Sequence, residues 1–383
     1  MSVYLDYNAT TPCDERVVEA MLPYFNGCFG NAASVDHDFG HTAQVAVEAA
    51  RADVAALVGA DPAEIIFTSG ATEANNIAIL GAMARAPDDS ELVVSAVEHP
   101  SVLEAARTLG SRLSVVGVSE NGVVDPDEVR RAISRRTALV SVMTANNETG
   151  VVQPTAEIGR ICREADVPFH TDAVQAGARM RIDVDTFQAS LLSLSAHKMY
   201  GPKGVGALYV RRRRPRPRLA PVLFGGGHER NLRPGTLNVP GIVGFGVAAR
   251  LVRSQGEEDW ARERMLLDRL RETLESAHPM TVHGEDVGRL PQTMSVRFHG
   301  IDARALMRSL AEHVAVSSGS ACSTTSVEPS PVLVAQGLDG DQIAETVRLS
   351  LGRMTTAAEI DLALDAITPA IERLRGLARA SAA

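Results

Sequence analysis

The chain has 383 residues, of which 45% are hydrophobic and 22% charged, and it carries a formal net charge of −9 at neutral pH. These values are typical of a globular enzyme with two or more domains, and the negative charge argues against direct nucleic-acid binding as the main activity. No run of about 18 apolar residues occurs and the first residues do not form a signal-peptide pattern, so we predict a cytoplasmic protein without a membrane span.

The first two thirds of the chain alternate helical patterns with short apolar runs. A helix is predicted over residues 41–59, where Val47, Val54, Leu57 and Val58 share one face and Gly59 ends the pattern. Strands that alternate with helices imply an α/β fold with a mostly parallel sheet between helices. We assign residues 15–250 to this large domain. Its seven predicted strands fall within residues 64–70, 91–100, 112–119, 137–146, 167–173, 190–197 and 206–213.

The pattern changes in the last third of the chain. A long, charged helix is predicted from Leu251 to Ser276, and an amphipathic helix over residues 357–379. Between them lie apolar runs at 292–298, 313–323 and 346–352, which indicate a smaller α+β domain. We assign residues 1–14 and 251–383 to this small domain.

Two features of the sequence, its cysteines and one basic segment, can be explained by structure alone as well as by a function. None of the four cysteines, Cys13, Cys28, Cys162 and Cys322, forms a C-x-x-C pair, which argues against a disulfide framework or a thiolate metal site, and no metal is predicted. Cys162 lies in a helical pattern typical of a core residue. The basic segment Arg211–Arg218 is either a solvated loop or a docking patch for an acidic partner.

Lysine is rare in this chain. Of 38 Lys and Arg residues only Lys198 and Lys203 are lysines, and both lie in SLSAHKMYGPKG. A lysine amine forms a Schiff base with an aldehyde, whereas a guanidinium does not. Lys198, which follows a predicted strand, is therefore interpreted as a required amine rather than a surface cation.

Polar residues follow several predicted strands at the edge where such sheets bind ligands. The segment 68–76 is rich in hydroxyl residues and opens a helix, which suits a phosphate, although a simple helix N-cap by Ser69 or Thr72 explains it equally well. A phosphate site, an acid and a Schiff-base lysine together describe pyridoxal phosphate (PLP). The other strand-end residues are Glu98, His99, Asn146, Asn147, Glu148, Asp172, Gln175 and His197.

Nine motifs, in order along nearly the whole chain, resemble those of cysteine desulfurases of the NifS/IscS type, within the fold-type I PLP enzymes. The resemblance extends from Tyr4 to about Leu374, and two of the motifs, SAHKMYGPKG and SSGSAC, are highly specific. The others are YLDYNATTP, FTSGATEANN, EHPSVL, NNETGVVQP, HTDAVQ, GGGHERNLRPGT and VRLSLGR.

The resemblance implies a role for each matching residue. Lys198 would hold PLP covalently, Asp172 would pair with the pyridinium nitrogen, Gln175 would contact the phenolic oxygen, and His99 would stack on the ring and transfer protons. Arg348 and Asn147, which also adjoins the cofactor, would bind the carboxylate of L-cysteine. The remaining implied residues are Ala71, Thr72, Ser195 and His197 at the phosphate, Asn31 at the substrate, and Thr236, which would reach the phosphate of the neighbouring subunit in a homodimer.

Cys322 lies in a run of small polar residues, SSGSACSTTS, which favours a nucleophile over a core cysteine. The resemblance implies that Cys322 takes sulfur from L-cysteine, leaving L-alanine and a persulfide that passes to an acceptor protein. The acceptor would serve iron–sulfur cluster assembly, tRNA thiolation or DNA phosphorothioation. Alternatives are a selenocysteine lyase or a small-substrate aminotransferase of the same fold, or an inactive sulfur-pathway scaffold.

The chain departs from the usual family pattern at a few places. Val35 stands where the family has arginine, Asp38 adds a charge nearby, Ala196 replaces glycine before His197, and Pro234 replaces serine. None of these changes removes a predicted catalytic group, but the change at Val35 leaves the identity of the acceptor open.

Overall fold

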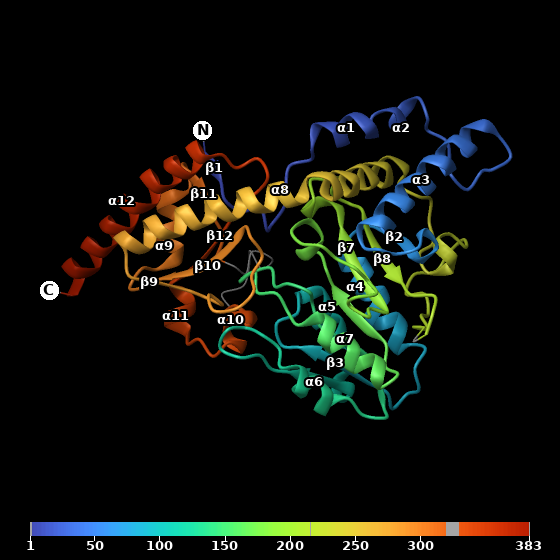
Figure 1. Ribbon diagram of the computed structural model, residues 1–383, viewed down its shortest axis with the longest axis horizontal. Helices are drawn as coiled ribbons and strands as arrows, with labels where there is room; N and C mark the ends of the chain where they lie inside the picture. The colour runs from blue at the N-terminus through green and yellow to red at the C-terminus, as the bar shows by residue number, and fades with distance from the viewer. Residues whose placement is uncertain (1, 215, 319–328, 383) are drawn as a thin grey trace.

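The computed structural model describes residues 2–214, 216–318 and 329–382, the last five of them as backbone only (Figure 1). Its main element is a seven-stranded sheet in the order β2-β8-β7-β6-β5-β3-β4. Strands β3 to β7 run parallel, and β8 is antiparallel to both of its neighbours. The predicted mostly parallel sheet is therefore confirmed. Its strands are β2 (Ile65–Thr68), β3 (Glu91–Ser95), β4 (Leu113–Val116), β5 (Thr137–Ser141), β6 (Phe169–Asp172), β7 (Leu191–Ser195) and β8 (Gly206–Val210).

Helices cover both faces of this sheet because successive strand residues point to opposite sides. In β7, Leu191 packs in a core with α4 and α5, whereas Leu192 packs in a second core with α3 and α8. Val140 and Phe169 extend the second face into a core with α6 and α7. The helices are α1 (Glu15–Met21), α2 (Pro23–Asn26), α3 (Asp38–Leu57), α4 (Ala71–Met83), α5 (Pro100–Arg107), α6 (Pro126–Ala132), α7 (Thr155–Glu164) and α8 (Val239–Ala277).

The C-terminal third forms an antiparallel sheet in the order β12-β10-β9 and contributes β11 to a parallel pair with β1. These strands share a hydrophobic core with α9, α12 and the second half of α8. The elements are β1 (Val3–Tyr4), β9 (Met280–Val282), β10 (Thr293–Phe298), α9 (Ala303–Leu310), β11 (Val314–Ala315), α10 (Pro331–Ala335), α11 (Gly340–Ala344), β12 (Thr346–Ser350) and α12 (Ala357–Ala382).

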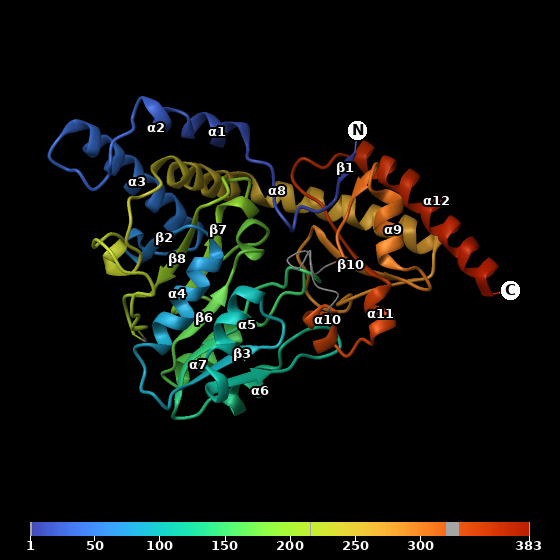
Figure 2. The same cartoon turned by 180° about the vertical axis from the view of Figure 1, so that it is seen from behind.

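Helix α8 begins at Val239, twelve residues before the position expected from its charged pattern. Three glycines in its first turns lower helix propensity and hid this part of the helix from the sequence pattern. Gly246 has a packing reason, since a Cβ there would lie 2.7 Å from the Ala50 Cα of α3. Figures 1 and 2 show α8 spanning both halves of the molecule without a break, so the predicted domain boundary at residue 250 stays a prediction.

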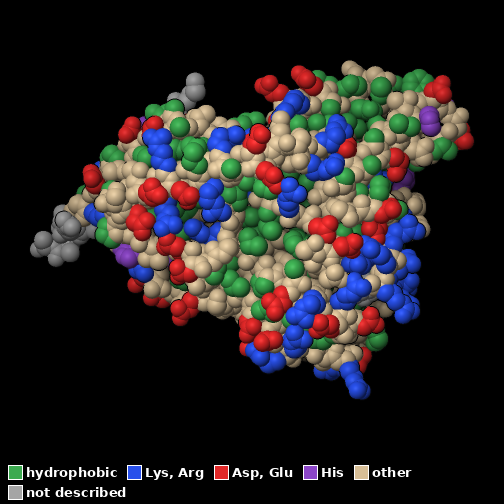
Figure 3. Space-filling view, viewed as in Figure 1, with side chains coloured by type: hydrophobic (Ala, Val, Ile, Leu, Met, Phe, Trp, Pro, Cys, Tyr) green, Lys and Arg blue, Asp and Glu red, His purple; other side chains and the backbone are tan. Residues whose placement is uncertain are grey.

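The segment Arg211–Arg218 follows β8 and lines a cavity of about 990 Å³ together with Arg85 and Arg230. Basic side chains gather over this part of the molecule at the lower right of Figure 3. Arg211 differs from the rest because it is buried, donates to the Ala189 carbonyl at 3.1 Å and pairs with Asp185 at 3.2 Å. Both readings of the segment, solvated loop and docking patch, remain open.

In the described part of the chain, no helix combines the length and the apolar character needed to cross a membrane.

Candidate active site

A cavity of about 580 Å³ lies at the carboxyl ends of the parallel strands. Open α/β sheets bind ligands at this edge. The structure brings together here most of the predicted site residues, which reach the cavity from β12, from the segments after β3, β5, β6 and β7, and from the start of α4. Those lining it are Ala71, Thr72, His99, Asn147, Asp172, Gln175, Ser195, His197, Lys198 and Arg348.

Lys198 ends the short 3-10 helix Ala196–Lys198, which directly follows β7. Its Nζ donates to the carbonyl oxygens of Asn8 and, at 2.8 Å, Ala9. Gln175 Nε2 donates to the same Asn8 carbonyl at 3.0 Å. Backbone carbonyls of the N-terminal segment therefore hold the amine at one wall of the cavity.

Asp172 ends β6 and is almost fully buried. Its Oδ2 accepts from Asn75 Nδ2 at 2.7 Å and its Oδ1 from the Val174 amide at 3.0 Å. Asn75 also donates to Ser101 Oγ at 2.8 Å, and this hydroxyl lies 2.8 Å from His99 Nδ1. A hydrogen-bonded chain thus connects the carboxylate to the imidazole and fixes both side chains.

The first turn of α4 opens on the same cavity and offers an anion site. Its N-cap is Gly70, with φ of +155° and no capping side chain, so the amides of the first turn are not capped by a side chain. Gly206 of β8 permits this geometry, because a Cβ there would lie 2.7 Å from the Gly70 carbonyl carbon. Ser195 and His197 line the wall nearby.

Burial, together with the positive charges of Lys198 and Lys203, lowers the pKa of His197 to about 4. The ring is therefore neutral at pH 7. Its Nδ1 lies 3.1 Å from Thr10 Oγ1, which fixes the ring orientation.

Arg348 of β12 reaches the cavity from the other sheet and is only 2% exposed. Its guanidinium donates to the Asn147 carbonyl at 2.9 Å and to Asp6 Oδ1 at 2.6 Å. A buried guanidinium of this kind suits bidentate recognition of a carboxylate.

Cys322 lies outside the described residues, but the residues that flank its segment contact the site. The Ser317 backbone pairs with that of Arg348. Ser330 caps α10 and its Oγ donates to Glu148 Oε2 at 2.6 Å. Burial raises the pKa of the Glu148 carboxyl, whereas the hydrogen bond from Ser330 and the positive charge of Arg348 act to lower it.

Two predicted residues do not reach the cavity. Thr236 and Asn31 are both exposed and do not line it. Asn31 uses its side chain locally, since its Oδ1 accepts from the Ala33 amide at 3.0 Å.

Two residues at the site were missed by the sequence analysis. Asn75 was treated only as part of the phosphate segment, although a buried asparagine among the apolar residues of a helix is a usable signal. Asn8 was part of a quoted motif without a role; its side chain bonds Thr293 Oγ1 at 2.9 Å while its carbonyl faces Lys198. No sequence pattern marks a backbone carbonyl as a ligand of a lysine.

The residues present fit PLP. An uncapped helix N-terminus suits the phosphate, Asp172 provides the acid, and Lys198 provides the amine, all on one cavity of a size usual for small ligands. All three groups belong to the part of the chain that the structure describes.

Comparisons with known proteins agree with this geometry. The family model "Aminotransferase class-V" matches residues 3–363. A cysteine desulfurase IscS from Anaeromyxobacter sp. (strain Fw109-5) is 50% identical over 378 residues, which cover 97% of this chain and 93% of the relative. Among solved structures, a NifS-like protein matches with a TM-score of 0.90 at 33% identity, covering 98% of this chain and 100% of its own. SspA in complex with cysteine matches with a TM-score of 0.80 at 36% identity, covering 93% and 100%.

The matches extend over nearly the whole chain and include the strand ends, helix N-terminus and arginine that form the cavity. The chain belongs to the class-V aminotransferase family and, within it, to the PLP-dependent cysteine desulfurases.

Proposed function

We propose that the protein removes sulfur from L-cysteine and gives L-alanine and a persulfide on Cys322. The observation that carries this proposal is the joint placement of Lys198, Asp172 and Arg348 on one cavity. An amine, an acid and a carboxylate-binding arginine are the groups that an amino-acid substrate of a PLP enzyme requires. The NifS/IscS relatives and the neighbour solved with cysteine support cysteine as this amino acid.

The side chains divide the work by position. Arg348, with Asn147 beside it, binds the substrate carboxylate and orients the α-carbon toward Lys198. When bound, PLP supplies an electron sink for the bond that breaks at the α-carbon. Lys198 Nζ takes the α-proton, and Asp172 is the carboxylate that would pair with the pyridine nitrogen of PLP. His99, fixed through Ser101, moves a proton at the substrate sulfur.

Cys322 is the proposed sulfur acceptor. Its thiolate attacks the substrate sulfur, so that the carbon–sulfur bond breaks, a sulfur–sulfur bond forms, and the carbon takes a proton to become alanine. One cysteine and one thiol thus give one alanine and one persulfide, and no oxidant is needed. The contacts of Ser317 and Ser330 with the site support this role, because both ends of the segment meet residues at or beside the cavity.

The test is to add L-cysteine and a reductant to the purified holoenzyme and to measure alanine and sulfide. We expect one alanine per sulfide, and Cys322→Ala should abolish sulfide release while Cys28→Ala should not. Failure of the wild-type protein to release alanine would overturn the proposal. A keto acid product would indicate an aminotransferase, and turnover of selenocysteine alone would indicate a selenocysteine lyase.

We further propose that the enzyme acts in the cytoplasm as a homodimer and passes its sulfur to an acceptor protein. Thr236 is exposed and away from its own cavity, which supports its predicted contact with the phosphate of the neighbouring subunit. Exposed apolar side chains between the start of α1 and the first turn of α3 provide a surface that a second copy would cover. They are Val18, Leu22, Phe25, Phe29 and Phe39.

A further inference from the structure

Lys198 and Arg348 belong to different sheets, although they must act on the same substrate molecule. Lys198 follows β7 of the seven-stranded sheet, whereas Arg348 lies in β12 of the three-stranded sheet. A misplacement of about 1 Å between reacting groups costs on the order of a hundredfold in rate. Some structure must therefore fix one residue relative to the other.

Tyr200, two residues after Lys198, is held firmly by the N-terminal segment. It has a φ of +63°, which is uncommon for a residue with a side chain. Its amide donates to Thr11 Oγ1 at 2.9 Å, and its carbonyl accepts from the Asp14 amide at 3.0 Å. These contacts compensate for the unusual backbone conformation. They also fix the direction of the Tyr200 ring relative to the turn at residues 198–200, which we call the Lys198 turn.

The ring of Tyr200 contacts two guanidinium groups. That of Arg353 lies 4.1 Å from the ring centroid and that of Arg179 lies 5.5 Å from it. The Tyr200 hydroxyl accepts from the Arg353 backbone amide and, at 3.2 Å, from Arg179 Nη2. Arg353 is five residues beyond Arg348, so this hydroxyl connects the Lys198 turn to the end of the strand that carries the substrate-binding arginine.

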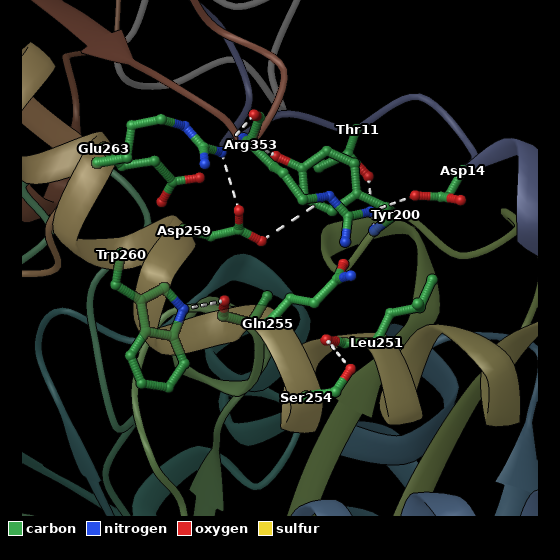
Figure 4. Close-up of polar contacts among 12 residues, drawn as sticks. Thr11, Asp14, Tyr200, Leu251, Ser254, Gln255, Asp259, Trp260, Glu263 and Arg353 are labelled. Carbon is green, nitrogen blue, oxygen red and sulfur yellow. Dashed lines mark hydrogen bonds and ion pairs between the residues drawn. The ribbon is translucent and has the colours of Figure 1, made fainter.

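Acidic residues from two other segments complete the cluster. Asp14 Oδ2 accepts from Arg353 Nη2 at 2.8 Å. Figure 4 shows Asp259 and Glu263 on α8, on the side where Arg353 and Tyr200 lie. Glu263 is fully buried and its Oε2 lies 3.2 Å from Arg179 Nε, while Asp259 Oδ2 lies 4.0 Å from Arg353 Nε. Helix α8 contributes to the cores of both halves, so the cluster is fixed on a rigid element common to both.

We propose that Tyr200 is a positioning residue, whose hydroxyl and ring hold the Lys198 turn in register with the Arg348 strand through Arg353. This inference rests on the proposed function, in which Lys198 takes the α-proton of the substrate and Arg348 binds the substrate carboxylate. It concerns alignment between the two groups and not contact with the substrate, since Tyr200 does not line the cavity.

The test replaces Tyr200 by phenylalanine, which keeps the ring beside both guanidinium groups and removes only the hydroxyl. Tyr209→Phe is the matched control, because Tyr209 is a buried tyrosine of β8 whose hydroxyl has no hydrogen-bond partner in the described structure. We expect Tyr200→Phe to keep its bound PLP and to lose about tenfold or more in kcat. KM for cysteine should change much less, because the contacts of Arg348 with Asp6 and Asn147 remain. Tyr209→Phe should match the wild type.

A second readout does not depend on turnover. The visible absorbance of bound PLP reports the surroundings of Lys198, and its pH midpoint should move by about half a unit in Tyr200→Phe and stay in place in Tyr209→Phe. If Tyr200→Phe does not fold, Arg353→Lys keeps a charge beside Asp14 and the backbone amide on the Tyr200 hydroxyl, removes only the guanidinium from the ring, and should lower kcat in the same direction by a smaller factor. A Tyr200→Phe protein with wild-type kcat and pH midpoint would overturn the inference. A wild-type protein that releases no alanine would overturn the proposed function instead, and the pH midpoint would then decide this inference alone.

Discussion

Lys198 and Lys203 have different surroundings although both line the cavity. Lys198 donates to two backbone carbonyls inside it, whereas Lys203 is exposed within a turn at its rim. Composition drew attention to both lysines equally, the position of Lys198 after a predicted strand separated them, and the hydrogen bonds of the folded chain agree with that distinction.

We therefore expect Lys198→Ala to lose the covalently bound PLP and at least about a thousandfold in alanine release, because the other lysine, Lys203, lies exposed at the rim of the cavity. Lys203→Arg should keep the visible absorbance and most of the activity. Absorbance spectroscopy and borohydride reduction followed by peptide mapping check both variants. A PLP label on residue 203 in the wild-type protein would contradict the assignment.

Glu98 is a fully buried carboxyl next to the site. Its Oε1 accepts from Ser95 Oγ at 2.5 Å and from the Met143 amide at 2.7 Å. Burial and, to a smaller extent, the charge of Asp172 outweigh the opposing effect of the two hydrogen bonds and raise the pKa of Glu98 to about 8. The folded protein thus keeps this group protonated at neutral pH.

A pH-dependent stability follows from this raised pKa. The free energy of unfolding should fall as the pH rises from about 4.5, the value of an unburied Glu, to about 8, because only the folded state retains the proton there. Glu98→Gln should remove this contribution, which is of the order of 1 kcal/mol per pH unit within that window. Urea unfolding at several pH values measures it.

The exposed Glu104 of the following helix provides the control, since Glu104→Gln should leave the pH dependence as in the wild type. Parallel pH curves for the wild type and Glu98→Gln would contradict the prediction.

At the scale of elements, the N-terminal end of α4, where we propose that the phosphate binds, depends on a neighbouring strand. β8 approaches Gly70 so closely at Gly206 that a side chain there would meet the Leu194 carbonyl at 2.6 Å and the Gly70 backbone at 2.7 Å. The sequence predicted both elements, but it contained no sign that a glycine in one shapes the N-terminus of the other.

Gly206→Ala should therefore push β8 away from Gly70 and misalign the first turn of α4. We expect a loss of about 1–3 kcal/mol in unfolding free energy, which is typical of overpacking, and a PLP affinity lower by about tenfold. Gly340→Ala, where a Cβ would meet nothing within 4 Å, is the control and should change neither. Equal PLP affinity in both variants would show that β8 does not shape the site.

At the scale of the whole molecule, the largest exposed apolar side chains lie mainly on the N-terminal elements. Phe25 and Phe29 are 63% and 65% exposed, and the ring of Phe29 lies 5.5 Å from that of Phe39. Monomers rarely expose such a cluster without a partner. The surface fits the proposed homodimer, in which Thr236 would complete the site of the other subunit.

The double variant Leu22→Asp and Phe25→Asp should shift the protein from dimer to monomer and weaken PLP retention, because Thr236 would lose access to the second site. Analytical ultracentrifugation measures the first effect and dialysis against buffer the second. Leu362→Asp, on an exposed position of α12, should change neither. A wild-type protein that sediments as a monomer would exclude the dimer.

The sequence by itself determined the fold class, the strands and the main chemical groups, because apolar periodicity and strand-end polar residues are local patterns. Lys198 and His99 follow strands and Asp172 ends one, so all three could be found in this way. Arg348 could not, since it lies within a strand of the other sheet, and it was predicted only through the resemblance.

Only the tertiary structure decided which residues meet. The carbonyls of Asn8 and Ala9 on Lys198, the chain from Asp172 through Asn75 to His99, and the Tyr200 cluster all join segments far apart in sequence. The physical reason is that backbone carbonyls, buried amides and stacked guanidiniums have no periodic sequence signal. Their effect depends on distances that exist only once both sheets pack along α8.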